Sequence, residues 1–292
     1  MNTRTAVITG AAGGLGQATA RRLLDAGFDV IAVTRDADSA RTTRHTLTGG
    51  TVHTLHADLV DRDDLRALAG RLPDITGQVD VLINNAGAAF PEYGQTPDGV
   101  ERTHALNHLA PFHLTHLLLE HGVLAADARI ITISSDLVTR GRLDPQDPDI
   151  TGTTWHDRFS QLAVYGTAKL MSLMATAALA ERLPAGMNAY SANPGVIRTG
   201  FNAKSGGLLK SVATVSGWFA QSPDRAARVP AGLATATPAP QPTGGWFDKT
   251  GAATPPVTAL DATLGAEIYE RTAAALGLCP LPRDARNPGA IR

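Results

Sequence analysis

Short apolar runs without polar alternation recur along the chain, and longer amphipathic stretches separate them. Unbroken apolar runs are typical of strands buried on both faces, as in a parallel sheet covered by helices. After the first run, Leu15, Ala18, Leu23 and Leu24 follow helical spacing and are expected to be buried. This alternation predicts an α/β fold with a doubly wound parallel sheet in a single domain spanning 1–292. The expected strands are 5–9, 28–33, 52–55, 79–83, 129–133, 187–191 and 244–247, and the expected helices include 16–26, 61–72 and 258–276.

The charge balance argues against a nucleic-acid partner. Lys and Arg number 26 and Asp and Glu number 27, which gives a formal net charge of -1. A protein that neutralises phosphates needs a basic surplus, and this chain has none. Its 43% hydrophobic residues are enough for a globular core,.

The sequence also argues against secretion and against membrane insertion. Cys279 is the single cysteine, so no intrachain disulfide can form,. The apolar run 5–9 is too short for a signal peptide, and the apolar stretch 170–179 falls short of the roughly 20 residues of a membrane span,. We therefore expect a cytoplasmic protein that does not attach to a membrane.

A glycine-rich turn follows the first expected strand and opens the first expected helix. Its sequence is Thr9-Gly-Ala-Ala-Gly-Gly-Leu-Gly16. Glycines at such a turn let the backbone approach a pyrophosphate, which then lies at the helix N-terminus. This context predicts a Rossmann-like dinucleotide site rather than an ordinary glycine turn. The cofactor-binding residues expected here are Gly10, Gly14, Leu15 and Gly16.

The end of the second strand bears on the choice of cofactor. A site for NAD usually has an acid there to bind the ribose 2′-hydroxyl, whereas a 2′-phosphate favours arginine. Thr34 and Arg35 occupy this position, so we expect NADP(H) to be preferred, with NAD(H) possible. Asp36 is the opposing feature, because its carboxylate could turn toward the ribose.

Two further strand ends supply candidate contacts to the adenosine. Asp58, with Leu59 beside it, follows the third strand and could accept a hydrogen bond from the adenine amino group. Alternatively, an Asp in the stretch 58–61 caps the next helix. After the fourth strand, small residues would let the chain pass close to the adenosine. They are Asn85, Ala86 and Gly87.

Tyr165 and Lys169 are four residues apart on an expected helix and would share one face,. An ammonium beside a phenol favours the phenolate, and lowering the pKa from 10 to about 7 takes roughly 4 kcal/mol. The pair is therefore a candidate for proton transfer.

The motifs occur in an order that resembles the short-chain dehydrogenase/reductase family, from Thr5 to about Leu278. The matching elements are the glycine turn, the stretch 84–87, Asn107, Ser134-Ser135, Tyr165 with Lys169, and the stretch 193–199. The resemblance implies an NAD(P)-dependent enzyme that transfers hydride between the nicotinamide and a ketone or aldehyde, or the corresponding alcohol.

The resemblance also implies the role of each residue. Tyr165 would be the general acid or base, and Ser135, with Ser134 as the alternative, would bind the carbonyl oxygen. Lys169 would hold the nicotinamide ribose and lower the pKa of the tyrosine, and Asn107 would anchor a water in the proton relay. The residues expected to line the nicotinamide and its phosphate are Pro194, Gly195, Val196 and Thr199.

The spacing between serine and tyrosine narrows the resemblance. Ser135 lies 30 residues before Tyr165, which is further than in the shorter family members. Such a long insertion is similar to that of the retinol-dehydrogenase-like branch. That branch handles bulky apolar carbonyls and alcohols. Family members commonly pair through the helices that bear Asn107 and Tyr165, so a homodimer or homotetramer is also expected. Two alternatives stay open: a redox-neutral isomerase, dehydratase or cyclase on the same fold, and an NADP-sensing binding protein without catalysis.

Two irregular segments, 136–161 and 200–221, fall where ligands bind in open α/β sheets,. We expect both to be substrate-side insertions; the alternative is loops that contact nothing. Their large apolar residues could wall a substrate pocket, although anchoring of the loops to the core explains them nearly as well. These residues are Trp155, Phe159, Phe201, Trp218 and Phe219.

Five histidines crowd one expected helix. His104 and His108 have a spacing that could chelate zinc, but no Cys cluster or HExxH pattern accompanies them,. We therefore expect no metal, and a solvated or subunit-facing surface for the group. The five are His104, His108, His113, His116 and His121.

Overall fold

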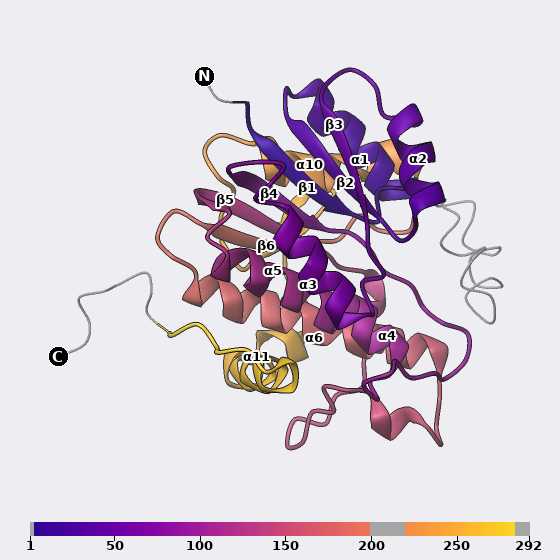
Figure 1. Ribbon diagram of the computed structural model, residues 1–292. Helices are drawn as coiled ribbons and strands as arrows, with labels where there is room; N and C mark the ends of the chain where they lie inside the picture. Colours follow the sequence, from indigo (N-terminus) through magenta and orange to yellow (C-terminus); the bar gives the residue numbers. More distant parts are fainter. Residues whose placement is uncertain (1–2, 199–219, 284–292) are drawn as a thin grey trace.

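An eight-stranded sheet runs through the protein in the order β3-β2-β1-β4-β5-β6-β7-β8. The computed structural model describes residues 3–198 and 220–283 (Figure 1). Strands β1 to β7 pair in parallel, and β8 runs antiparallel to β7. The strands are β1 (Thr5–Thr9), β2 (Asp29–Thr34), β3 (Val52–His56), β4 (Val79–Asn84), β5 (Leu124–Ile133), β6 (Asn188–Ala192), β7 (Trp246–Asp248) and β8 (Gly251–Ala253).

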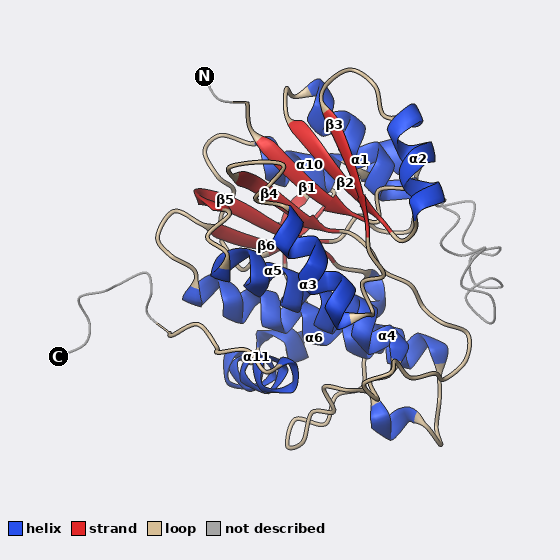
Figure 2. Cartoon of the chain, viewed as in Figure 1, coloured by secondary structure: helices blue, strands red, loops and turns tan. Residues whose placement is uncertain are grey.

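Helices cover both faces of the sheet, as the doubly wound prediction requires (Figure 2),. α1 and α10 pack together on one face, and α3, α5 and α6 cover the other. The longer helices are α1 (Gly14–Asp25), α2 (Ala37–Thr46), α3 (Arg62–Arg71), α5 (Ala110–Glu120), α6 (Gln161–Arg182), α10 (Arg228–Thr235) and α11 (Ala262–Leu276). The short ones are α4 (Arg102–His104), the π-helical turn η1 (Ala105–Leu109), the 3-10 turns η2 (Asp136–Arg140), η3 (Thr153–Trp155) and η4 (Val257–Leu260), and α9 (Pro223–Ala226).

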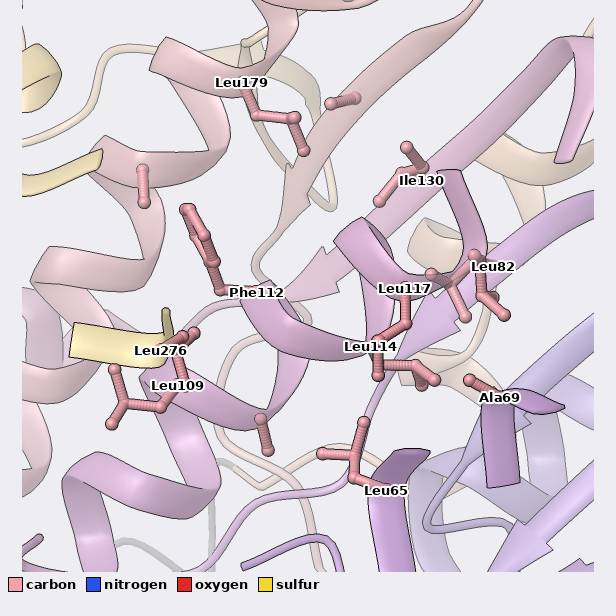
Figure 3. Close-up of a cluster of buried hydrophobic side chains, with 14 of the residues drawn as sticks. Leu65, Ala69, Leu82, Leu109, Phe112, Leu114, Leu117, Ile130, Leu179 and Leu276 are labelled. Atoms are coloured by element: carbon pink, nitrogen blue, oxygen red, sulfur yellow. The ribbon is translucent and has the colours of Figure 1, made fainter. Parts of the chain in front are cut away.

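A hydrophobic core lies on each face of the sheet. On one face, leucines of α3 and α5 pack onto the side chains of β4 and β5, as the labels Leu65, Leu114, Leu82 and Ile130 show in Figure 3. The other core holds the α1 residues whose burial the helical spacing predicts. They are Leu15, Ala18, Leu23 and Leu24.

The strand order reverses between β1 and β4. From β1 the chain builds outward through β2 and β3, and it then returns to add β4 on the other side. At such a reversal the loops leaving neighbouring strands diverge and open a crevice at their carboxyl ends, where ligands bind. The glycine turn after β1 and the stretch 85–87 after β4 both lie at this end. The predicted fold class is therefore confirmed.

Some boundaries differ from the prediction. β5 begins at Leu124 rather than at residue 129, because the chain pairs with Val79 before the register shifts. The terminal helix begins at Ala262 rather than at 258, since Asp261 accepts hydrogen bonds from the backbone N–H groups of Thr263 and Leu264 and so caps the helix,. The short strand β8 is not predicted from the sequence.

α6 is the central helix of one core. It is longer than the apolar stretch 170–179 and, by length and composition alone, could cross a membrane. However, 89% of its most apolar window is buried inside the protein, so its apolar residues are explained by packing.

α11 lies across α6 and also contacts α5. Two buried hydrogen bonds join it to the histidine-rich helix: His108 Nε2 lies 2.8 Å from Thr272 Oγ1, and His116 Nε2 lies 2.8 Å from Tyr269 OH. α11 is thus fastened to the core by polar as well as apolar contacts.

The histidines correct the sequence prediction. A solvated or subunit-facing surface was expected, but His104, His108, His113 and His116 are all at most 5% exposed, and only His121 of the group is exposed. The reason is that their helix packs against the sheet on one side and α11 on the other. Within residues 3–198 and 220–283, no group of three or more His, Cys, Asp or Glu side chains could hold a metal ion.

We expect these buried histidines to make the fold sensitive to acid. Burial lowers the pKa of His108 to about 3 and those of His113 and His116 to about 4. The unfolded chain, with pKa values near 6.5, binds more protons below that pH, so unfolding becomes easier as the pH falls from about 6.5 to 4. Each histidine contributes up to about 1.4 kcal/mol per pH unit to the slope.

Urea unfolding between pH 7 and pH 5 would measure this slope. His113→Leu should reduce the dependence of stability on pH, because it removes one of the titrating groups. Leucine breaks no hydrogen bond here, since neither ring nitrogen of His113 has a hydrogen-bond partner in the described part of the chain. His121→Gln, at the exposed end of the same helix, is the matched control. Equal slopes in wild type and His113→Leu would contradict the prediction.

Candidate active site

The glycine turn packs against the end of β4. Asn85 Nδ2 donates to the carbonyl oxygens of Thr9 at 2.8 Å and Gly10 at 3.2 Å. Gly10 has φ +68°, and a Cβ there would lie 2.9 Å from Ala86 Cα. A Cβ on Gly16 would lie 2.4 Å from the carbonyl oxygen of Gly10. The turn therefore needs glycine at both positions.

The N-terminus of α1 points out of this turn. Its N-cap is Gly13, which offers no side-chain hydrogen bond, and its first turn has no acidic residue. Gly14 and Leu15, also expected to bind cofactor, are the first two residues of the helix. Uncapped backbone N–H groups and the helix dipole suit a diphosphate. These residues fit the dinucleotide that the sequence predicts.

At the end of β2, three consecutive side chains differ in burial and in their hydrogen-bond partners. Thr34 is buried, and its hydroxyl donates to the carbonyl oxygens of Asp36 and Leu55. The Arg35 side chain is 79% exposed and lies 3.7 Å from the Asp36 carboxylate. Asp36 is the N-cap of α2 and accepts from the backbone N–H of Ser39 at 2.8 Å. Arg35 is thus the most exposed of the three side chains, although the Asp36 side chain is also 46% exposed.

Asp61, and not Asp58, takes the role of helix cap that the sequence left open. Asp61 is the N-cap of α3 and accepts from the N–H groups of Asp63 and Asp64. Asp58 instead accepts from the N–H of Val60 at 3.3 Å in a short turn. The helix cap therefore does not depend on Asp58.

Tyr165 lies on α6 beside Ser135. The two side chains are hydrogen bonded, and Ser135 Oγ also accepts from the N–H of Leu137 at 3.2 Å. Burial raises the pKa of the Tyr165 phenol, and the hydrogen bond with Ser135 opposes the rise. Ser134, the alternative serine, is buried, and its hydroxyl has no hydrogen-bond partner among the residues described.

Lys169 does not lower the tyrosine pKa as expected. Its Nζ lies 5.9 Å from the centre of the Tyr165 ring and donates to the carbonyl oxygen of Ile133 at 2.7 Å. Burial lowers the pKa of the lysine itself to about 8. Burial therefore dominates the phenol pKa, and the expectation of a phenol pKa near 7 is wrong for the protein alone,.

Asn107 lies in the π-helical turn η1, fully buried. Its Nδ2 donates to the carbonyl oxygens of Ala88 at 2.7 Å and Thr103 at 2.8 Å. A Cβ built on Gly87 would lie 2.6 Å from Asn107 Oδ1 and 3.5 Å from Lys169 Nζ. The structure thus brings Asn107 and Lys169 to the same place, next to Gly87.

The chain after β6 lies next to the chain that follows Ser135, just after the end of β5. Asn193 Nδ2 donates to Asp136 Oδ1 at 2.6 Å, and Asn193 Oδ1 accepts from the N–H of Gly195. Val196 is 44% exposed. Thr199, which was expected to contact the cofactor phosphate, lies outside the described residues, as does 200–219 of the second irregular segment, with Phe201, Trp218 and Phe219.

The first irregular segment is anchored to the protein, so the alternative that it contacts nothing is wrong. Trp155 is buried against Ala163 and Val164 of α6, and Phe159 packs beside it. Gly141 lies against the backbone of Gly166. Trp155 therefore anchors the segment to the core.

The contacts of three residues were not predicted, although Thr9 and Asn193 lie in motifs that the sequence analysis identified. Thr9 Oγ1 accepts from the N–H groups of Asn85 and Ala86 and so joins β1 to β4. Asp136 and Asn193 join the chain ends after β5 and β6. All three lie where a strand ends or just after it, and this position was the signal available.

Comparisons with known proteins agree with the geometry. A sequence-family model described as "short chain dehydrogenase" matches residues 4–143. "Putative daunorubicin C-13 ketoreductase DnrU" of Streptomyces sp. (strain C5) is 34% identical, covering 94% of this chain and 93% of that protein. Human retinol dehydrogenase 13 is 31% identical, covering 96% and 88%. A blue fluorescent protein from a metagenomic library, solved with NADPH, has a TM-score of 0.65 at 28% identity, covering 85% of this chain and 96% of that one.

A glycine turn at the reversal point of a parallel sheet, with a buried tyrosine and lysine and a partly buried serine, defines an oxidoreductase that uses a nicotinamide cofactor on CH–OH and C=O groups. The chain belongs to the short-chain dehydrogenase/reductase family.

Proposed function

We propose that this enzyme reduces a bulky apolar ketone or aldehyde with NADPH, or oxidises the corresponding alcohol with NADP. The observation that carries the proposal is the hydrogen bond between Tyr165 and Ser135, with Lys169 one turn further along α6. NADPH, when bound, would supply the hydride.

The protonation of Tyr165 favours reduction. Because burial raises the pKa of the phenol, it is protonated at neutral pH and can donate its proton to a carbonyl oxygen that gains charge,. Ser135 Oγ accepts from the N–H of Leu137, and its hydroxyl, which is hydrogen bonded with Tyr165, would turn its proton to the same oxygen once a carbonyl binds,. Lys169 and Asn107 would hold the nicotinamide ribose and the relay water that returns a proton to Tyr165.

The accessible arginine at the end of β2 supports NADP(H). Arg35 is exposed, whereas the opposing carboxylate of Asp36 is engaged at the N-terminus of α2. A guanidinium pairs well with a 2′-phosphate. The related protein solved with NADPH points the same way.

An apolar substrate is supported by the surroundings of the phenol. Leu137 and Leu162 are partly buried and pack against Ala89 and Tyr165. Two relatives are named as a daunorubicin C-13 ketoreductase and as a retinol dehydrogenase, so the substrates in their names are both large organic molecules. We therefore extend this substrate class to the present chain.

The location and assembly that the sequence predicted stay proposals: a cytoplasmic protein that forms a homodimer or homotetramer. Pairing through α5 and α6 would have to accommodate α11, which lies on both helices.

The loss of NADPH absorbance with a panel of apolar ketones, aldehydes and quinones tests the proposal. We expect at least one carbonyl to be reduced, and faster with NADPH than with NADH. Binding of either cofactor without consumption by any carbonyl would contradict the reductase assignment and favour redox-neutral chemistry or a sensor.

Arg35→Ala tests the cofactor preference separately. We expect the Kd for NADPH to rise by roughly 10-fold or more, since one charge-assisted contact is worth about 1.5–3 kcal/mol, with little change for NADH. Fluorescence titration would measure both constants. Arg41→Ala, on the exposed face of α2, is the matched control. An equal loss for the two cofactors in Arg35→Ala would refute the argument.

A further inference from the structure

The segment between Ser135 and Tyr165 contains a turn organised by one carboxylate. Asp149 Oδ1 accepts from the backbone N–H groups of Thr151 at 3.1 Å and Gly152 at 2.8 Å, and Oδ2 accepts from that of Thr154 at 2.8 Å. These bonds hold residues 149–154 in one conformation.

This turn packs against the start of the helix that carries Asn107. The carbonyl oxygen of Thr151 accepts from the N–H of Glu101 at 2.8 Å. Gly152 is buried with φ +73°, and a Cβ there would lie 2.5 Å from His104 Nδ1 and 2.8 Å from Glu101 Cβ. The contact is therefore too close for any side chain at position 152.

Glu101 is a buried carboxylate whose bonds all lie at the beginning of this helix. Oε2 accepts from the backbone N–H of His104 at 2.9 Å and faces His104 Nδ1 at 3.1 Å. Oε1 accepts from the hydroxyl of Thr103 at 2.9 Å. Both side chains of the Glu101–His104 pair are fully buried, so the carboxylate depends on these donors for its stabilisation,.

Thr103 contacts both Glu101 and Asn107. Its carbonyl oxygen accepts one of the two amide protons of Asn107, and the carbonyl oxygen of Ala88 accepts the other. With both protons engaged, the amide must present Oδ1 toward Gly87 and Lys169. The orientation of the Asn107 amide thus depends on where Thr103 is held.

We infer that Glu101 is a positioning residue for Asn107, and that the turn around Gly152 holds Glu101 in place. The long segment between serine and tyrosine then has a second role besides shaping the substrate side, because it fixes a group of the proton relay through Gly152, Glu101 and Thr103. This inference rests on the proposed reductase function, within which Asn107 takes part in proton transfer.

The variants Glu101→Ala and Gly152→Ala test the inference from the two sides of the contact. For both we expect kcat for carbonyl reduction to fall roughly 10- to 100-fold, with the Kd for NADPH and the KM for the carbonyl nearly unchanged, as for a small displacement of a catalytic group. Glu101→Gln can still accept from the N–H of His104 through its amide oxygen while its NH2 group donates to the hydroxyl of Thr103, and it should restore most of the loss. Gly99→Ala is the matched control, because Gly99 also has positive φ but a Cβ there would meet nothing within 4 Å.

A double-mutant cycle distinguishes positioning from a general loss of structure. If Glu101 acts through Asn107, the pair Glu101→Ala with Asn107→Ala loses no more activity than Asn107→Ala alone. Multiplied losses in the double variant would overturn the inference, as would unchanged kcat in both Glu101→Ala and Gly152→Ala.

A second readout does not need turnover. The NMR signals of the Asn107 side-chain amide are identified by their loss in Asn107→Ala. In Glu101→Ala and Gly152→Ala their chemical shifts should change and their protons should exchange faster with solvent, but not in Gly99→Ala. Signals that stay unchanged in the first two variants would overturn the inference even if no substrate is found. Absence of reduction by the wild type would instead contradict the proposed function, and the amide signals would still decide the positioning role.

Discussion

Tyr165→Phe should lower kcat for carbonyl reduction by roughly 10²- to 10⁴-fold, the usual contribution of a positioned general acid. The substitution removes the phenol O–H and leaves the ring, which packs against Ala89, Leu137 and Leu162. We therefore expect the fold and the Kd for NADPH to be retained. Steady-state kinetics with a saturating carbonyl, together with a fluorescence titration of NADPH, would measure the two quantities.

Tyr93→Phe provides the control for this substitution. Tyr93 lies in the loop before α4 and packs with Phe159 and His156, in a different hydrophobic cluster from that of Tyr165. It should keep most of the wild-type activity. Turnover near the wild-type level in Tyr165→Phe would remove the proposed acid and leave Ser135 as the main group that stabilises the carbonyl oxygen.

Gly16→Ala should prevent the glycine turn from taking its present form. The new Cβ would lie 2.4 Å from the carbonyl oxygen of Gly10 and 2.6 Å from Asn85 Nδ2, so backbone has to move. Overpacking of this kind costs about 1–3 kcal/mol, and a loss of that size in cofactor binding corresponds to roughly 5- to 150-fold. Isothermal titration with NADPH and a thermal melt would show the combined effect.

Gly13→Ala is a matched control two positions from Leu15, at the N-cap of the same helix. Gly13 has extended backbone with φ 176°, and a Cβ there would meet nothing within 4 Å. We expect a change of about 1 kcal/mol or less, which is the usual cost of placing alanine at an N-cap. Equal losses from the two substitutions would show that the close contact at Gly16 is unimportant.

Features that repeat locally in the chain were predictable from the sequence. The buried strands and the α1 face follow from the spacing of apolar residues, since burial on both faces of a parallel strand leaves little room for polar residues. The glycine turn was also predictable, because only glycine tolerates a contact such as that between Gly16 and the Gly10 carbonyl. The order of these motifs then located Tyr165, Lys169 and Asn107.

Features that depend on contacts between distant segments were not predictable. The histidines have the composition of a polar surface, and the burial of His108 and His116 depends on α11, which lies more than a hundred residues further along the chain. Likewise, Lys169 follows Tyr165 at helical spacing, but its ammonium is directed to the Ile133 carbonyl because β5 passes next to α6. Spacing shows which residues share a helix face and gives no information about the third segment that packs on it.

α6 carries the proposed catalytic pair and is the most completely buried helix described in the chain; 19 of its 22 residues are buried. The backbone amides around Tyr165 and Lys169 should therefore exchange with solvent only when the whole protein unfolds. Heat would then destroy the chemistry and the fold at the same temperature, without a range in which a folded but inactive protein accumulates. For the same reason, directed evolution toward new substrates would find tolerant positions in the loops after β5 and β6, while changes within α6 would reduce stability before they altered selectivity.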